Sequence, residues 1–168
     1  MLESERLKII PLNYDQLKKY TACDNSLENE LGLKNSSRII PEHLKNVIIN
    51  KVLPAVKKDS GSFLYNTIWL ATDIQKNVIV ASFGFKGLPN DEKEIEIGYG
   101  TESEFQNKGY MTEAISCAVD WAKNRSDIYY IIAETDSDNI ASVKVLEKNG
   151  FIQFKKTENN IRWRVNCK

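Results

Sequence analysis

The sequence predicts an α/β (α+β) fold, a single domain over residues 1–168 with a central mixed, mostly antiparallel sheet and helices on both faces. Three observations lead to this expectation. Helical spacing dominates the residues up to about 60. Apolar, β-branched runs separated by polar turns then indicate an antiparallel meander. The second half alternates strand, helix, strand, helix and strand, which places a parallel crossover in the sheet.

The N-terminal part contains the first expected elements. The run RLKII (6–10) predicts a short strand, and Asn13 is a typical N-cap for a helix over residues 14–21. Ser26 is interpreted as the cap of a short helical turn in SLENELGL. The next segment, PEHLKNVIINKVLPAVKKD, has apolar residues at helical spacing, and Pro54 is expected to kink or split it.

The remaining elements follow in order. The expected strands are NTIWLAT, VIVASFGF, EIEIGYG, DIYYIIAET, FIQFKK and IRWRVN. A helix after the third of these strands has one apolar face, and DNIASVKVLEKNG predicts a second helix that ends at Gly150. The residues of that apolar face are Met111, Ile115, Ala118, Val119 and Ala122.

Composition narrows the class of protein. Lys plus Arg and Asp plus Glu both number 23, so no basic excess points to a nucleic-acid partner. The chain has 3 Cys without metal or disulfide spacing, and a single His, His43, which is expected on the surface; no metal is expected. We see no signal peptide and no run long enough to span a membrane. The expected location is cytoplasmic.

The stretch EFQNKGYMTEA is the strongest candidate binding motif. Gly109 stands where a helix begins, and the first N–H groups of a helix lack internal partners and attract anions. Gln106, Asn107 and Lys108 add donors and one positive charge. The stretch is therefore either a cradle for pyrophosphate or an ordinary helix entry, and the residues alone do not decide.

The strand before this stretch carries two acids. Glu94 and Glu96 alternate with apolar residues, so both side chains lie on one face of the strand. They are either functional carboxylates or solvated surface acids. Asn139, after a later strand, is most simply an N-cap.

Together these motifs resemble the GNAT superfamily of acetyl-CoA-dependent N-acetyltransferases. EIEIGYGTESEFQNKGYMTEA is similar to its acetyl-CoA motif, [Q/R]-x-x-G-x-[G/A], with Met111 where a small residue is usual, and DNIASVKVLEKNGF is similar to its later strand–helix motif. The likeness is greatest to the branch with ribosomal-protein N-terminal acetyltransferases. It covers residues 65–156, the expected acetyl-CoA-binding core, and leaves residues 1–60 as an expected helical region on the acceptor side.

The resemblance implies roles for particular residues. Glu96, with Glu94 second, would be the general base that takes a proton from the acceptor amine. Many members have a Tyr general acid where this chain has Leu146; Ser142 would then protonate the leaving thiolate, or no dedicated acid is needed. The residues expected to bind acetyl-CoA, the co-substrate, are Tyr99, Gly100, Thr101, Gln106, Asn107, Lys108, Gly109, Tyr110, Met111, Asn139 and Ser142.

The expected activity is transfer of an acetyl group to a primary amine by direct attack in a ternary complex. The acceptor is a small molecule or a protein N-terminus, and the protein is a monomer or a homodimer. Three alternatives stay open. The first is a GNAT fold that holds CoA as a sensor or interaction module without turnover, and the second is an acyltransferase that uses another acyl group or a hydroxyl acceptor. A plain phosphate-binding α/β protein is the third.

Overall fold

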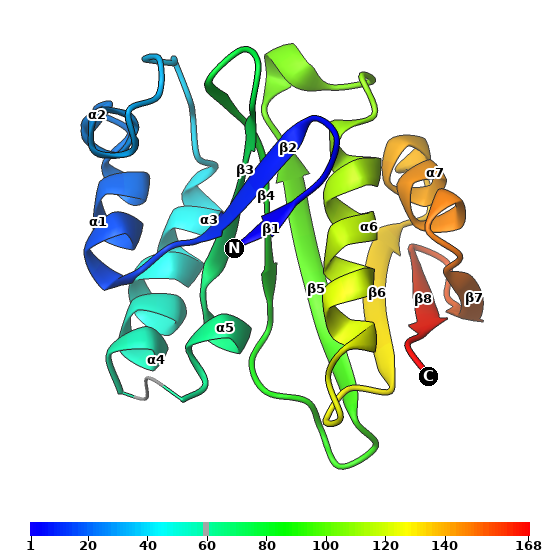
Figure 1. The fold of residues 1–168 in the computed structure, drawn as a ribbon. Helices are drawn as coiled ribbons and strands as arrows, with labels where there is room; N and C mark the ends of the chain where they lie inside the picture. The colour runs from blue at the N-terminus through cyan, green and yellow to red at the C-terminus, as the bar shows by residue number, and fades with distance from the viewer. Residues whose placement is uncertain (59–60) are drawn as a thin grey trace.

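A computed structural model describes residues 1–58 and 61–168 of the chain. One eight-stranded sheet with the order β1-β2-β3-β4-β5-β6-β8-β7 runs through the molecule (Figure 1). Neighbouring strands are antiparallel except for β5 and β6, which run parallel. The strands are β1 Leu2–Glu3, β2 Leu7–Pro11, β3 Ile68–Asp73, β4 Val78–Phe85, β5 Glu94–Thr101, β6 Tyr130–Asp136, β7 Ile152–Lys156 and β8 Asn160–Asn166.

Helices cover both faces of this sheet, as the sequence predicts. Figure 1 shows α1 to α4 on one side and α6 with α7 on the other, and each set packs over its own cluster of buried apolar side chains. A π turn, Ile48–Val52, joins α3 to α4, and a 3₁₀ turn, Ser103–Phe105, precedes α6. The helices are α1 Tyr14–Ala22, α2 Ser26–Leu31, α3 Glu42–Val47, α4 Leu53–Lys58, α5 Phe63–Asn66, α6 Tyr110–Lys123 and α7 Ile140–Lys148.

Of the two helix caps predicted near the N-terminus, one is confirmed and the other is wrong. Asn13 caps α1: its Oδ1 accepts the Gln16 N–H at 2.9 Å, and Gln16 Oε1 accepts the Asn13 N–H at 3.1 Å. The prediction that Ser26 caps α2 is wrong. Ser26 is the first residue of the helix, Asn25 in the left-handed region precedes it, and the Ser26 hydroxyl donates to Asp24 instead.

Pro54 distorts its helix as expected, but the distortion lies just before it. The chain continues through α3 and α4, and the π turn at 48–52 widens the helix immediately ahead of Pro54. A proline ring clashes with the carbonyl of the preceding turn and removes one donor, and a widened turn accommodates both effects. Two short elements, β1 and α5, were not predicted, because two to four residues are too few to show a periodic pattern.

The crossover from β5 through α6 to β6 forms as predicted and packs through the expected face. Met111, Ile115, Ala118, Val119 and Ala122 of α6 are all buried against the sheet. Among the described residues, no helix is both long enough and apolar enough to cross a membrane.

The parallel pair in the middle of the sheet opens along its length. β5 and β6 are paired at Glu94–Tyr130, Ile95–Ile131 and Glu96–Ile132 and at no later position. Beyond this point β5 stays paired with β4 as far as Thr101, while β6 stays paired with β8. The two strands therefore separate after Glu96, and the edge of β5 that faces β6 has no strand partner from there on.

Candidate active site

A cavity of about 310 Å³ lies where β5 and β6 separate. Tyr99 of β5 and Asn139 and Ser142 at the start of α7 line it, so three of the residues expected at the cofactor meet there. The Asn139 side chain caps α7, because its Oδ1 accepts the Ser142 N–H at 3.0 Å. The N-cap prediction for Asn139 is thus confirmed, and the cap sits beside the opening in the sheet.

Two hydroxyl groups are joined in this cavity. The Tyr99 hydroxyl and Ser142 Oγ are 2.7 Å apart, and the Tyr99 hydroxyl also lies 3.3 Å from the Ser142 carbonyl oxygen, to which it can donate. Burial raises the pKa of Tyr99, and the hydrogen bond to Ser142 opposes this shift. The Tyr99 hydroxyl is therefore protonated at neutral pH. Tyr99 and Ser142 thus form a pair of hydrogen-bonded hydroxyl groups next to the point where β5 and β6 separate.

Leu146 stands one turn further along α7 and faces the core. Its side chain is fully buried within the apolar cluster between α6, α7 and the sheet. The position at which the family resemblance implies a tyrosine acid is thus part of the packing here. The hydroxyl-bearing residues that line the cavity are Tyr99, Ser142 and Thr135, and the Thr135 hydroxyl already accepts from Trp163 Nε1 at 3.0 Å.

The start of α6 has a backbone turn at the position that the sequence marks as a candidate anion site. Gly109 is the N-cap residue with φ 80°, and Asn107 has φ 60°, so the chain turns through two left-handed residues before the helix. The backbone N–H groups of residues 107–112 have no hydrogen-bond partner within the described part of the chain. The arrangement leaves a run of donors free at the positive end of a helix dipole.

Side chains in this stretch contribute unequally. Tyr110 and Met111 are buried in the core, so only their backbone N–H groups remain available to a ligand. Lys108 donates from Nζ to the Glu104 carbonyl at 2.7 Å and stays beside the turn. Gln106 lines a second, larger cavity on the other side of β5.

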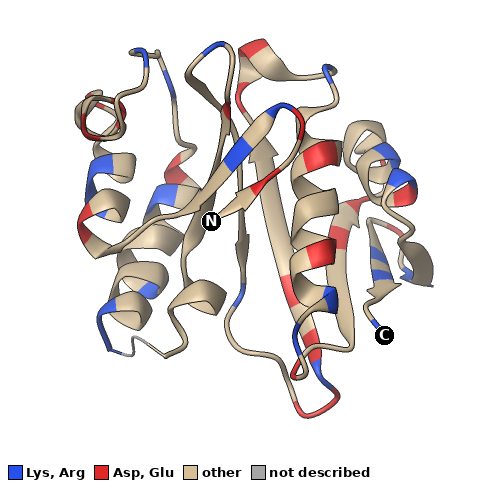
Figure 2. Ribbon diagram, viewed as in Figure 1, with Lys and Arg blue, Asp and Glu red and all other residues tan. Residues whose placement is uncertain are grey.

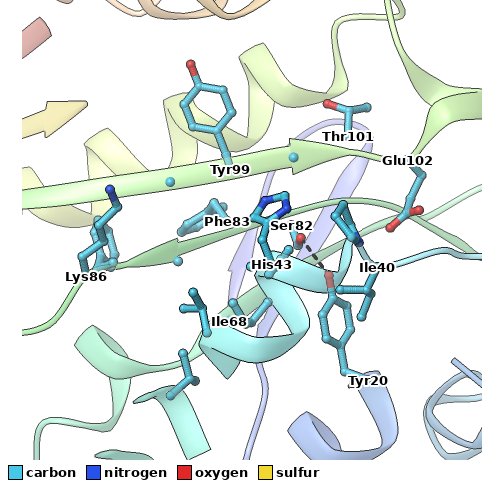
Figure 3. A pocket seen from close by; sticks show the side chains of 18 of the residues that line it. Tyr20, Ile40, His43, Ile68, Ser82, Phe83, Lys86, Tyr99, Thr101 and Glu102 are labelled. Atoms are coloured by element: carbon cyan, nitrogen blue, oxygen red, sulfur yellow. Dashed lines mark hydrogen bonds between the residues drawn. The ribbon is translucent and has the colours of Figure 1, made fainter. Parts of the chain in front are cut away.

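This larger cavity is a groove of about 1020 Å³ between the sheet and the segment that leads into α3 (Figure 3). Its floor is made of residues with little or no side chain: Gly84 and Ser82 of β4 lie opposite Gly98 and Gly100 of β5. A Cβ built on Gly100 would meet no atom within 4 Å. Because side chains alternate along a strand, the missing ones on this face create the groove.

The two ends of the groove carry opposite charges. Lys86 stands at one end and Glu102 at the other in Figure 3, with His43 and Ile40 between them. Lys86 forms an ion pair with Glu96, whose side chain is 29% exposed. The charge of Lys86 is thereby compensated.

Glu102 has no hydrogen bond or ion pair from its carboxylate to any described residue. Burial raises its pKa, the positive charge of Arg38 opposes the shift, and the charge of Glu28 adds to it. Sequence reasoning missed Glu102, because it lies in the turn after the strand and no motif marks it. His43 is exposed, as predicted, but it also lines the groove.

The two acids of β5 lie in different settings, although both are on the face expected. Glu96 occupies the last paired position before β5 and β6 separate, whereas Glu94 is two residues earlier. The Glu94 carboxylate is approached by the Asn90 amide at 3.4 Å and lines neither cavity. Glu96 does not line a cavity either, but its partner Lys86 lines both.

Among residues 1–58 and 61–168 there is no group of three or more His, Cys, Asp or Glu arranged to hold a metal ion. The candidate site consists of three parts along β5: the cavity at Tyr99 and Ser142, the free N–H groups at the start of α6, and the groove.

Comparison with known proteins agrees with this geometry. The acetyltransferase (GNAT) domain family matches residues 14–152 of the chain. The uncharacterized N-acetyltransferase YjdG of Bacillus subtilis (strain 168) is 28% identical over 167 residues, covering 97% of this chain and 96% of that protein.

Solved structures share the fold at low sequence identity. The acetyltransferase that modifies the N-terminal serine of ribosomal protein L7/L12 in Salmonella typhimurium has a TM-score of 0.65 and 18% identity over 97% of this chain and 96% of its own. Spermidine N-acetyltransferase from Vibrio cholerae, in complex with CoA and spermine, has a TM-score of 0.66 and 14% identity over 97% and 96%. The family match, which covers most of the chain, shows that this protein belongs to the GNAT family and is an N-acetyltransferase.

Proposed function

We propose that this N-acetyltransferase moves the acetyl group of acetyl-CoA to a primary amine by direct attack in a ternary complex. The observation that carries the proposal is the separation of β5 from β6 after Glu96. It opens a polar cavity on one side of β5, and the large groove lies on the other side. Two substrates would then approach one strand from opposite faces.

Residues 99–111 provide the elements of a CoA site. The unpaired edge of β5 at Tyr99, Gly100 and Thr101 offers backbone groups to the pantetheine arm, and the free N–H groups of residues 107–112 suit the pyrophosphate. Asn139 and Ser142 would border the opposite side. Bound acetyl-CoA supplies an already activated thioester, so positioning accounts for much of the rate.

Glu96 is the proposed general base. An amine with a pKa near 10.4 enters mostly as the ammonium ion and must lose a proton before it attacks. A carboxylate can take that proton directly or through one water. Glu96 stands where the strands separate, and this position favours it over Glu94.

Ser142 is the proposed donor to the leaving thiolate. Its Oγ is 2.7 Å from the Tyr99 hydroxyl, so a proton lost by Ser142 can be replaced from Tyr99. This pair would take the place of the tyrosine that Leu146 replaces.

The groove is the proposed acceptor site, formed in part by residues 1–60. Its apolar walls and the acid Glu102 at one end fit a primary amine on a small molecule or at a protein N-terminus. The similar structures act on a ribosomal-protein N-terminus and on spermidine, which fall in these two classes.

Calorimetric titration tests the cofactor part first. Acetyl-CoA, CoA and ATP are titrated in parallel into the purified protein. We expect both thioester and free CoA to bind and ATP not to bind. A folded sample that binds no acetyl-CoA would overturn the proposal.

A screen of amine acceptors, in which the release of the free CoA thiol is monitored, then tests the proposed general base. Glu96→Gln should lower kcat by about 10²- to 10⁴-fold, as loss of a general base does. CoA affinity should stay unchanged, because the groups proposed to hold CoA lie elsewhere. Glu94→Gln is the matched control, since it removes the same charge from the same face two residues away. Equal losses in the two variants would contradict the assignment of Glu96.

The same variants separate an enzyme from a CoA sensor. A sensor would bind CoA equally in wild type and Glu96→Gln and would release thiol in neither, with any acceptor. Thiol release by the wild type alone supports the enzyme.

A further inference from the structure

The turn between β1 and β2 touches the first turn of α6, although more than 100 residues separate them in sequence. Figure 2 shows that this turn carries both basic and acidic positions and lies near the start of α6, whose first turn has an acidic band. The residues are Arg6 and Glu113: Arg6 Nε donates to Glu113 Oε2 at 2.7 Å, and Arg6 Nη2 lies 2.6 Å from the same oxygen. The contact joins the N-terminal hairpin to the helix that begins at Gly109.

The backbone around Arg6 is held as firmly as the side chain. Its N–H donates to Glu113 Oε1 at 3.0 Å, and its carbonyl accepts the Ile74 N–H at 2.9 Å. Ser4 Oγ donates to Glu113 Oε1 at 2.6 Å. These bonds lower the pKa of Glu113 although burial pushes it upward, and the hydrogen bond from Arg6 to Glu113 raises the pKa of Arg6.

A second contact of Arg6 reaches the cradle itself. Arg6 Nη1 donates to the carbonyl oxygen of Lys108 at 3.1 Å. A trans peptide is planar, with its carbonyl and its N–H pointing in opposite directions. A guanidinium that holds the Lys108 carbonyl therefore turns the Gly109 N–H away from Arg6, toward the free N–H groups of the helix start.

Charge adds to this geometry. Glu113 in the first turn of α6 would repel a phosphate bound at the same helix end. Arg6 neutralises it through two nitrogens and leaves the helix dipole to act on the ligand. The guanidinium also lies 4.7 Å from the ring centroid of Tyr110, whose hydroxyl donates to Asp73 at 2.6 Å.

From this set of contacts we propose that Arg6 is a positioning residue for the pyrophosphate of CoA. It acts through the Lys108–Gly109 peptide and through neutralisation of Glu113, and it does not itself need to touch the ligand. The inference rests on the proposed function, because it assumes that the start of α6 receives CoA.

The test compares two ligands on each variant. CoA carries the pyrophosphate and is titrated by calorimetry; S-acetylpantetheine lacks it and is followed by ligand-observed NMR. Arg6→Gln should weaken CoA about tenfold, the usual effect of losing one charge-assisted contact, and should leave S-acetylpantetheine unchanged. A role of Arg6 in general folding would weaken both ligands together, and that result would overturn the inference.

Lys76 provides the matched control. Its Nζ lies 5.2 Å from the ring centroid of Tyr110 on the same part of the surface, and it pairs with Asp73 at 2.8 Å without a contact to Lys108. Lys76→Gln removes an equal charge, so it should cost CoA binding much less than Arg6→Gln. Equal losses would assign the effect to net charge and overturn the positioning role.

The outcomes also separate this inference from the proposed function. Failure of the wild type to bind CoA sinks the proposed function, and the inference with it. Normal CoA binding by Arg6→Gln sinks the inference alone. If Arg6→Gln does not fold, Arg6→Lys decides, because lysine keeps the charge but cannot contact Glu113 and Lys108 at once. A CoA-selective loss in that variant supports the proposal, and equal binding contradicts it.

Discussion

The cradle at the start of α6 and the groove on the opposite side of β5 are built by different means. The cradle is made of backbone: free N–H groups, two left-handed residues and a helix end, fixed from outside by Arg6. The groove is made of absent side chains on β4 and β5 and of walls from a distant segment. Backbone geometry suits a ligand with a constant chemical group, whereas side-chain walls can change with the acceptor.

Among changes that set the cradle against the groove, the largest expected effect comes from breaking the cradle. Gly109→Val forces a β-branched residue to φ 80° and brings its Cβ to 3.4 Å from Arg6 Nη2. A left-handed backbone costs such a residue about 1–2 kcal/mol, so the turn should relax away from the geometry that presents its N–H groups, and CoA affinity should fall roughly five- to thirtyfold. Calorimetric titration with CoA measures this affinity. Gly109→Asn is the control, because Asn tolerates this region; a similar loss there would point away from backbone strain.

The groove should respond to the opposite kind of change. Gly100→Leu places a side chain in open space on the floor, so we expect the KM for the acceptor to rise about tenfold. CoA affinity should stay near wild type, because only the backbone of Gly100 is proposed to meet the pantetheine arm, and stability should stay near wild type too. Steady-state kinetics with a saturating thioester checks this. Gly84→Ala is a useful contrast, because its Cβ would meet Thr67 O at 3.2 Å and should destabilise the fold. A Gly100→Leu variant with an unchanged KM would show that acceptors bind elsewhere.

The smallest effect concerns the unpaired acid at the end of the groove. Because burial raises the pKa of Glu102, the folded protein holds this proton more tightly than the unfolded chain does. The stability that comes from this tightly held proton is fully present below the pKa of the unfolded chain, near 4.3. It is lost as the pH rises through the raised pKa of the folded protein. The free energy of unfolding of Glu102→Gln, relative to that of wild type, should therefore rise between pH 4 and pH 7, by less than about 1 kcal/mol. Denaturant melts at pH 4 and 7 measure the difference; a gain confined to pH 4 would contradict it.

The sequence allowed the start of α6 and the cap of α7 to be predicted far better than the groove, and the contrast between backbone and side chains explains why. Gly109, the face of α6 and the Asn139 cap are local signals, and the structure has each in its expected place. Glu102 and His43 line the groove only because β5 and α3 meet in space. No spacing rule connects them. Arg6 is a similar case, since its partner Glu113 lies 107 residues away.

Ser26 shows a further limit. Serine and asparagine are both good caps, and in the run Asp-Asn-Ser the sequence does not say which of them precedes the helix. The choice was settled by the left-handed turn at Asn25, a backbone property that composition does not record.

The continuous pairing of β5 with β4 has one more consequence. β5 continues from Glu96 to Thr101, and the 3₁₀ turn Ser103–Phe105 leads from its end to Gln106, so the number of residues between Glu96 and Gln106 fixes their spacing. With CoA bound as proposed, this spacing, at about 3.3 Å per residue in the strand, would set how far the acyl group reaches from the phosphates. Lengthening β5 by two residues would keep every side chain on its own face and yet move the carboxylate about 7 Å along the strand. The number of residues in β5 would thus determine the reach of the acyl group.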